Sequence, residues 1–233
     1  MPHDRFYFPA PLITGETISL KEAELHHLQV QKVRVGDEVE VVNGRRQLGL
    51  ATVRSLDKAQ ALLHIHAITT DSSVQRTIIL AQAIPKMNHL EWIIEKGVEL
   101  GVTSFWLFPG MYSEKTDFSE NQRTRLNHLI LSAMKQCGRL DLTTIEFKPR
   151  LLDWSPQKGT LLYGDLEAPY LWTINPTLQD PIILFIGPER GLHSQEITFL
   201  NGSMGAKGVK FHPNTLRTET ASLVGLSLIQ AFL

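Results

Sequence analysis

The sequence predicts an α/β protein with a small β-rich domain over residues 1–70 and a larger domain over residues 71–233. Two patterns carry this prediction. Before residue 70, short runs alternate between apolar and polar residues, as half-buried strands do. After it, buried apolar runs alternate with amphipathic segments, which is typical of a mostly parallel sheet with helices on both faces.

The first 70 residues are expected to form a small barrel-like sheet. Three strands are predicted, at residues 38–42, 49–53 and 62–68, with one helix at residues 21–30. Asn43 and Gly44 form a favoured hairpin turn between the first two strands. In the third strand, alternation places Leu63, Ile65 and Ala67 on one face.

The larger domain follows a polar, unpatterned segment, residues 69–76, which we interpret as a linker. Its expected strands are residues 77–83, 102–108, 142–147, 160–163, 182–186 and 209–211, and its last two helices are residues 194–200 and 218–232. One helix lies after each of the first two strands. The alternation of strand and helix predicts parallel pairing.

The ends of the two earlier helices can be predicted from capping patterns. Asn88 followed by Glu91 resembles a capping box, and Gly101 is expected to end that helix. Ser119 with Gln122 is expected to open the next helix in the same way. The buried stripe of this second helix is predicted to comprise Leu126, Leu129, Ile130, Ala133 and Met134.

Composition excludes several classes of protein. One cysteine in 233 residues excludes a disulfide framework within the chain, and no apolar run reaches the roughly 18 residues of a membrane helix. The first residues lack the pattern of a signal peptide, so we expect a soluble cytoplasmic protein with no membrane partner. His64 and His66 lack a third ligand, so no metal site is expected.

The formal net charge of −1 counts mildly against a nucleic-acid partner. Basic residues nevertheless gather at residues 32–34, 45–46 and 123–139. A local basic groove and scattered solvated charge remain equal alternatives at this point.

Two loops near the carboxyl end predict a ligand pocket. The strand at residues 182–186 runs into Gly187-Pro188, then Glu189 and Gly191, and ligands of parallel sheets bind beyond the carboxyl ends of strands. The second loop precedes the last helix and contains Arg217, which could hold an anion. Taken singly, the first is also compatible with an ordinary strand-to-helix turn and the second with a surface ion pair.

Four stretches together resemble a known family. They are Arg5-Phe6-Tyr7, the segment at residues 26–37 with its His-Leu and Val-Gly-Asp, the helix EWIIEKGVELGV at residues 91–102, and the two loops just described. This ordered set resembles the RsmE family of ribosomal RNA (uracil-N3)-methyltransferases, within the SPOUT class. The resemblance covers nearly the whole chain.

The resemblance implies a PUA-like barrel that grips RNA, followed by an α/β domain with a deep trefoil knot. General topology rules would have argued against the knot. It also implies a homodimer, S-adenosylmethionine as cofactor, and methylation of N3 of one uridine in 16S ribosomal RNA. The partner would be 16S rRNA or the assembled small ribosomal subunit. A related methyltransferase acting on tRNA and a non-catalytic RNA-binding protein are the alternatives.

The resemblance also assigns residues. The expected cofactor contacts are Tyr163, Gly164, Ile186, Gly187, Pro188, Glu189, Gly191, His212 and Leu216. Arg5 and Arg217 are the expected catalytic residues, because a cation near O2 or O4 would stabilise the uracil anion, or they would grip phosphate. The expected RNA contacts are Arg34, Arg45 and Arg139. For the base that removes the N3 proton, Glu189, Glu219 and bulk water remain open.

The chain departs from the family pattern at two positions of the first loop. Arg190 stands where the family usually has glycine, so we expect an ordinary φ there or an adjusted loop. His193 stands where serine or threonine usually caps the following helix, so the cap is expected to shift to Ser194.

Overall fold

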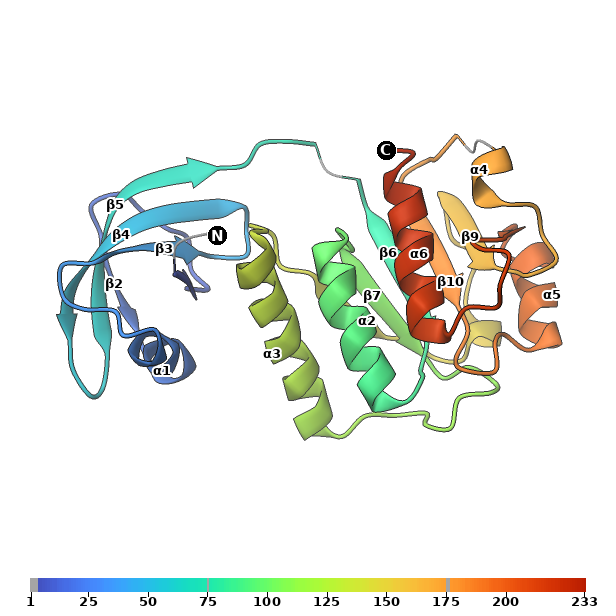
Figure 1. Cartoon of the computed structure of the whole chain (residues 1–233), viewed down its shortest axis with the longest axis horizontal. Helices are drawn as coiled ribbons and strands as arrows, with labels where there is room; N and C mark the ends of the chain where they lie inside the picture. The colour runs from blue at the N-terminus through green and yellow to red at the C-terminus, as the bar shows by residue number, and fades with distance from the viewer. Residues whose placement is uncertain (1–3, 75, 175–176) are drawn as a thin grey trace. The chain divides into compact units, whose positions relative to one another are not determined.

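The computed structural model describes residues 4–74, 76–174 and 177–233 (Figure 1). The chain divides into two compact units. The first contains Met1–Val74 and Leu131–Leu142, and the second contains Gln75–Ile130 and Thr143–Leu233. The end of the long helix α3 (Glu120–Cys137) therefore belongs to the first unit. The assignment of domains to residues 1–70 and 71–233 stays a prediction.

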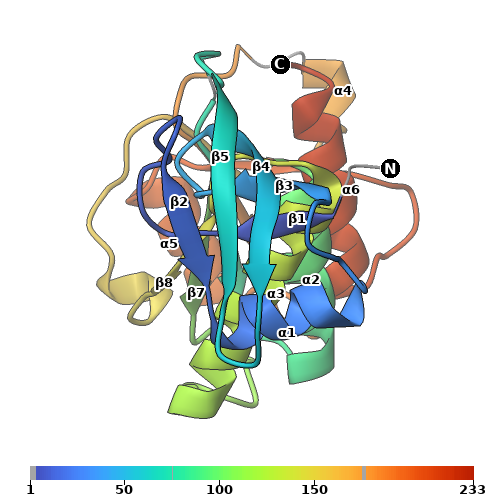
Figure 2. The ribbon, with the colours of Figure 1, turned by 90° about the vertical axis from the view of Figure 1, so that its left-hand side faces the viewer.

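The first unit is built on a five-stranded sheet with the order β1-β3-β4-β5-β2 (Figure 2). Its elements are β1 (Arg5–Tyr7), β2 (Thr17–Leu20), α1 (Glu22–Val30), β3 (Glu38–Val42), β4 (Gln47–Leu56) and β5 (Ala61–Thr70). Side chains that alternate along these strands form one buried apolar cluster, in which Phe6, Val41 and Leu63 are fully buried. The predicted helix and three strands are confirmed. The last two of these strands, β4 and β5, are longer than expected.

A β-bulge explains one wrong prediction in β5. Leu50 pairs with Ala67 but its neighbour Ala51 pairs with Ile65, so His66 is the extra residue on this strand. Beyond a bulge the alternation changes phase. Ala67 is therefore exposed, and Ile68 packs against the core in its place.

The first residues of the segment interpreted as a linker have defined contacts. Thr69 and Thr70 belong to β5, and the Asp71 carboxylate accepts a hydrogen bond from the Ser73 backbone at 2.8 Å. Asp71 also forms an ion pair with Arg46 at 3.1 Å. Gln75 lies outside the described residues.

The second unit is built on a six-stranded sheet in which every pairing is parallel, as predicted. The strand order is β11-β9-β10-β6-β7-β8. The strands are β6 (Ile78–Ala83), β7 (Ser104–Phe108), β8 (Thr144–Phe147), β9 (Thr160–Gly164), β10 (Ile182–Ile186) and β11 (Lys207–Val209). Every residue of the central strands β6 and β10 is buried. The trefoil knot stays a prediction.

Helices cover both faces of this sheet. On one face α2 (Met87–Glu99) and α6 (Thr218–Gln230) pack side by side (Figure 1). α2 lies so close to β7 that a Cβ on Gly97 would lie 2.7 Å from the Phe105 ring. The other face is packed by α5 (Ser194–Gly202) and the 3-10 turn η1 (Leu151–Asp153). A four-residue helix, α4 (Leu171–Ile174), precedes β10. Within the described residues, no helix is long and apolar enough to cross a membrane.

The capping predictions had different outcomes. Ser119 and Gln122 form the expected reciprocal box: the Ser119 backbone donates to Gln122 Oε1 at 3.0 Å, and the Gln122 backbone donates to Ser119 Oγ at 3.4 Å. Gly101, with a φ of 83°, follows the end of α2 as predicted. The prediction for Asn88 is wrong, because α2 begins one residue before it, at Met87.

Candidate functional site

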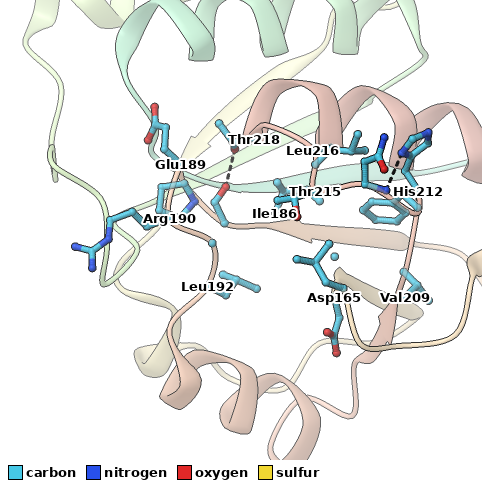
Figure 3. Close-up of a pocket in the computed structure, with 18 residues that line it drawn as sticks. Asp165, Ile186, Glu189, Arg190, Leu192, Val209, His212, Thr215, Leu216 and Thr218 are labelled. Carbon is cyan, nitrogen blue, oxygen red and sulfur yellow. Dashed lines mark hydrogen bonds between the residues drawn. The ribbon is translucent and has the colours of Figure 1, made fainter.

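A cavity of about 260 Å³ lies in the second unit at the carboxyl ends of β9, β10 and β11 (Figure 3). Two segments enclose most of it. We call residues 187–193, after β10, the first loop, and residues 210–217, between β11 and α6, the second loop. The lining residues are Gly164, Asp165, Leu166, Ile186, Gly187, Pro188, Glu189, Arg190, Gly191, Leu192, Val209, Phe211, His212, Asn214, Thr215, Leu216, Thr218 and Ala221.

Eight of the nine expected cofactor contacts line this cavity; the exception is Tyr163. Strand alternation explains the exception. Tyr163 points into the core on the α5 side of the sheet, where its hydroxyl hydrogen-bonds Asn201 Oδ1 at 3.0 Å. The next residue, Gly164, lies at the cavity wall.

The first loop is a tight turn that leaves no room for a side chain at one position and has a positive φ at another. A Cβ on Gly187 would lie 2.4 Å from the carbonyl carbon of Gly191, so no side chain fits there. Gly191 has a φ of 77°, and its backbone donates to the Pro188 carbonyl at 2.9 Å. Arg190 is not among the residues with positive φ, which confirms the expected ordinary backbone. Its side chain points away from the cavity (Figure 3), with the guanidinium 4.5 Å from the centre of the Tyr112 ring.

A buried polar network binds the first loop through the Gly187 carbonyl. The Gln82 side-chain amide donates to the Gly187 carbonyl at 3.1 Å and lies 3.2 Å from Thr218 Oγ1. Thr218 Oγ1 donates to the same carbonyl at 2.6 Å, and Ser222 Oγ donates to Gln82 Oε1 at 2.7 Å. All three side chains are buried. The network therefore joins β6 and α6 to the loop that carries the cavity wall.

Contacts of Glu189 with His89 and with the Lys86 backbone, which we call the ionic anchor, attach the first loop to the start of α2. Glu189 Oε1 accepts the Lys86 backbone N–H at 2.8 Å and lies 2.9 Å from His89 Nδ1. Glu189 thus binds the backbone of Lys86, the N-cap residue of α2, while Glu91 pairs with Arg125 instead of closing a capping box. Partial burial raises the pKa of Glu189, but hydrogen bonds from backbone N–H groups and from His89 outweigh it and lower that pKa below its ordinary value.

A second carboxylate approaches the same histidine. Glu219 Oε2, on the first turn of α6, lies 3.9 Å from His89 Nδ1. This oxygen is buried and has no hydrogen-bond partner within the residues that the structure describes. The ionic anchor of Glu189, His89 and the Lys86 backbone therefore lies next to a buried hydrogen-bond acceptor that has no donor among the described residues.

The end of the first loop corrects the prediction that Ser194 caps α5. His193 is the cap: its Nδ1 accepts the Gln195 backbone N–H at 3.1 Å. In return the His193 backbone donates to Glu196 Oε2 at 2.7 Å. Glu196 is almost fully buried, and its other oxygen accepts the Met111 backbone N–H at 3.0 Å. An imidazole nitrogen can replace the usual hydroxyl because it is also an acceptor.

The second loop supplies apolar surface and a polar rim. The predicted strand at residues 209–211 is displaced, because β11 ends at Val209 and leaves Phe211 to line the cavity. His212 Nδ1 accepts the Asn214 backbone N–H at 3.1 Å, which fixes the turn after Phe211 (Figure 3).

The two arginines expected to be catalytic occupy different surroundings. Arg217 is exposed at the start of α6 and is not among the residues that line the cavity. Arg5 belongs to the first unit, where it is buried and donates through Nε to Glu40 Oε2 at 2.8 Å. Their catalytic roles stay predictions.

The three expected RNA contacts all lie in the first unit. Arg34 and Arg45 are exposed. Arg139 is held by an ion pair with Asp141.

Sequence reasoning missed Gln82, His89 and Glu196, which shape the first loop. Gln82 and His89 lie far in sequence from the residues they contact: Gln82 and Gly187 are 105 residues apart, and His89 and Glu189 are 100 apart. Glu196 contacts His193, three residues before it, and Met111, 85 residues before it. Two signals were available: a glutamine inside an otherwise apolar strand, since buried polar groups need partners, and the capping-box spacing of Glu196 from His193.

Comparison with known proteins agrees with this architecture. An RNA methyltransferase domain family matches residues 72–230, and an RNA methyltransferase PUA domain family matches residues 20–65. The chain is 29% identical to the ribosomal RNA small subunit methyltransferase E of Synechocystis, over 95% of this chain and 75% of that protein. It is 26% identical to the same enzyme of Bacillus subtilis, over 91% of this chain and 89% of that protein.

A solved structure is similar over nearly the whole length. It is the ribosomal RNA small subunit methyltransferase E of Neisseria gonorrhoeae bound to S-adenosylmethionine, with a TM-score of 0.88 and 28% identity. The similarity covers 98% of this chain and 97% of that one. Because the domain match spans most of the second unit and includes both loops of the cavity, the chain belongs to the RNA methyltransferase family.

Proposed function

We propose that this protein transfers a methyl group from S-adenosylmethionine to N3 of one uridine in 16S ribosomal RNA of the small subunit. The observation that carries the proposal is the cavity between the first and second loops, whose Gly187 leaves no room for a side chain. The similar Neisseria gonorrhoeae enzyme, whose structure contains S-adenosylmethionine, supports the choice of cofactor.

The residues of the cavity fit a cofactor of this kind. Leu192, Val209, Phe211 and Leu216 provide apolar surface for a flat ring system, while Gly187 and Gly191 bring backbone groups to the wall. Asp165 also lines the cavity and supplies a carboxylate. When bound, the cofactor would supply an electrophilic methyl group on a positively charged sulfur.

Reaction at N3 requires the uracil to lose its N3 proton as the new N–C bond forms and the S–C bond breaks. Arg217 or Arg5 would stabilise the negative charge that spreads to O2 and O4. Of the two carboxylates considered as proton acceptor, Glu189 already accepts two hydrogen bonds, whereas Glu219 has a buried oxygen without one. Glu189 lines the cavity and Glu219 does not, so Glu189, Glu219 and bulk water all stay candidate acceptors.

The proposal extends to the partners. A PUA-like first unit with exposed Arg34 and Arg45 would hold the RNA, and the target uridine would be unstacked to reach the cavity. We further propose that the enzyme works as a homodimer in the cytoplasm, on 16S rRNA or on the assembled subunit.

Methyl-transfer assays test this function. Purified protein is incubated with labelled S-adenosylmethionine and either unmethylated small subunits, naked 16S rRNA or tRNA, and the modified base is identified by mass mapping. We expect 3-methyluridine in the small-subunit RNA. Product only in tRNA would overturn the substrate assignment, and no cofactor binding at millimolar concentration would overturn the enzymatic role altogether.

A further inference from the structure

Two aromatic side chains outside the cavity form a stacked pair. The rings of Tyr170 and Trp172 are nearly parallel, with an interplanar angle of 18° and centroids 4.4 Å apart. Trp172 is nonetheless 46% exposed. The amino group of Lys210 lies 5.4 Å from the centre of the Tyr170 ring. We call Tyr170, Trp172 and Lys210 the aromatic platform.

Backbone hydrogen bonds attach the platform to the segment that leads into the cavity. The Leu171 N–H donates to the Lys210 carbonyl, and the Lys210 N–H donates to the Pro169 carbonyl, both at 3.0 Å. Lys210 directly precedes Phe211 and His212, which line the cavity. The platform is therefore fixed to the start of the second loop and belongs to the same unit.

The three side chains have the chemistry of a nucleotide site. An exposed indole already stacked on one face can receive a planar base on the other, since every base has a π-face. A lysine amino group over the Tyr170 ring can pair with a phosphate of the same RNA strand. An apolar protein surface would match the rings but would leave the lysine without an anionic partner.

We propose that the aromatic platform binds an unpaired nucleotide of the RNA substrate that lies close in sequence to the methylated uridine. The inference rests on the proposed function, because it takes the ligand in the cavity to be the cofactor and the target base to be unstacked. It assigns to the catalytic unit a share of RNA recognition that would otherwise fall to the PUA-like unit alone.

The chain offers a matched control for a test by substitution. Trp92, on α2, is 51% exposed and also carries a lysine over its ring, since Lys96 Nζ lies 5.3 Å from the ring centre. It is not part of the aromatic platform, and Lys96 is already paired with Glu95 and Glu99. Trp172→Ala and Trp92→Ala therefore remove equivalent side chains from two different surfaces.

The experiment measures the affinity of the full-length protein for a single-stranded oligoribonucleotide carrying the target sequence, together with KM and kcat for methylation. We expect Trp172→Ala to weaken RNA binding about tenfold, which corresponds to about 1.4 kcal/mol, and to raise the KM for RNA similarly. Trp172→Phe should recover most of the loss, and Trp92→Ala should change it less than twofold. Lys210→Gln should reduce the salt dependence of binding.

Two further measurements separate the possible failures. Calorimetry should show unchanged S-adenosylmethionine affinity for Trp172→Ala, and sedimentation should show an unchanged oligomeric state. Unaltered RNA affinity, or a change of oligomeric state that accounts for the loss, would overturn the platform while leaving the proposed function intact. If the wild-type protein methylates no RNA, the proposed function itself fails.

Discussion

Replacing Glu189 with alanine would remove the carboxylate that joins the first loop to the start of α2. Two hydrogen bonds to one charged oxygen are lost, from the Lys86 backbone at 2.8 Å and from His89 at 2.9 Å. Hydrogen bonds to charged groups contribute about 1.5–3 kcal/mol each. The Glu189 side chain is 32% exposed, so water replaces part of the lost hydrogen-bond free energy. The lower end of the range gives about 3 kcal/mol for the two hydrogen bonds together.

This free energy sets an upper limit on the effect on cofactor binding. A loss of about 3 kcal/mol corresponds to roughly a hundredfold weaker cofactor affinity. This limit is reached only if the loop must close again for each binding event. We expect the Kd for S-adenosylmethionine, measured by isothermal titration calorimetry, to rise about tenfold to a hundredfold in Glu189→Ala. Glu189→Gln keeps an acceptor for the Lys86 N–H and should lose less than tenfold.

The anchor also has a pH dependence of known sign. Since the pKa of Glu189 is lowered below its ordinary value of 4.5 in the folded protein, its contribution to stability is complete above about pH 4.5. That contribution is lost as the pH falls through the lowered pKa, and Glu189→Gln should not show the loss. If Glu189→Ala binds the cofactor as tightly as the wild type, the anchor does not position the loop and the reasoning is wrong.

Four other substitutions test the cavity and its surroundings. Gln82→Leu should lower the free energy of unfolding by about 1–3 kcal/mol in urea denaturation, because it disrupts the buried network, and an unchanged midpoint would contradict that role. Gly187→Ala should weaken cofactor binding, measured by calorimetry, more than tenfold, since the added Cβ would lie 2.4 Å from backbone atoms. In Gly191→Ala the added Cβ meets nothing within 4 Å, so this substitution should lower the free energy of unfolding only by the strain of a positive φ, about 1–2 kcal/mol. Arg217→Ala should abolish turnover in the methylation assay with an unchanged circular dichroism spectrum, and wild-type activity would remove Arg217 from the mechanism.

Features fixed by neighbouring residues could be predicted from the sequence. The Ser119 and Gln122 box requires only a spacing of three, and Gly101 ends α2 through its own backbone conformation. The strand at residues 182–186 matches β10 because its apolar run is bounded by Pro181 and Gly187. The positions of the first and second loops could also be predicted, since each joins an expected strand to an expected helix.

Features fixed by distant residues, or by local residues outside the usual rules, could not be predicted in the same way. Asn88 and Glu91 have the spacing of a capping box, but α2 begins at Met87, and the N–H of its N-cap residue Lys86 is bound by Glu189, which nothing local indicates. His193 caps α5 through a ring nitrogen that capping rules do not rank among good caps. The bulge at His66 changes the phase of β5, and alternation alone gives no sign of it.

The position of β6 has a consequence for synthesis of the chain. All six of its residues are buried, and one of its two edges is covered only by β10, more than 90 residues later in the sequence. Until Ile182–Ile186 leaves the ribosome, a nascent second unit presents an apolar strand edge with open backbone donors and acceptors. Chains that stall before this point should therefore aggregate or require a chaperone, whereas chains that extend past β10 should not.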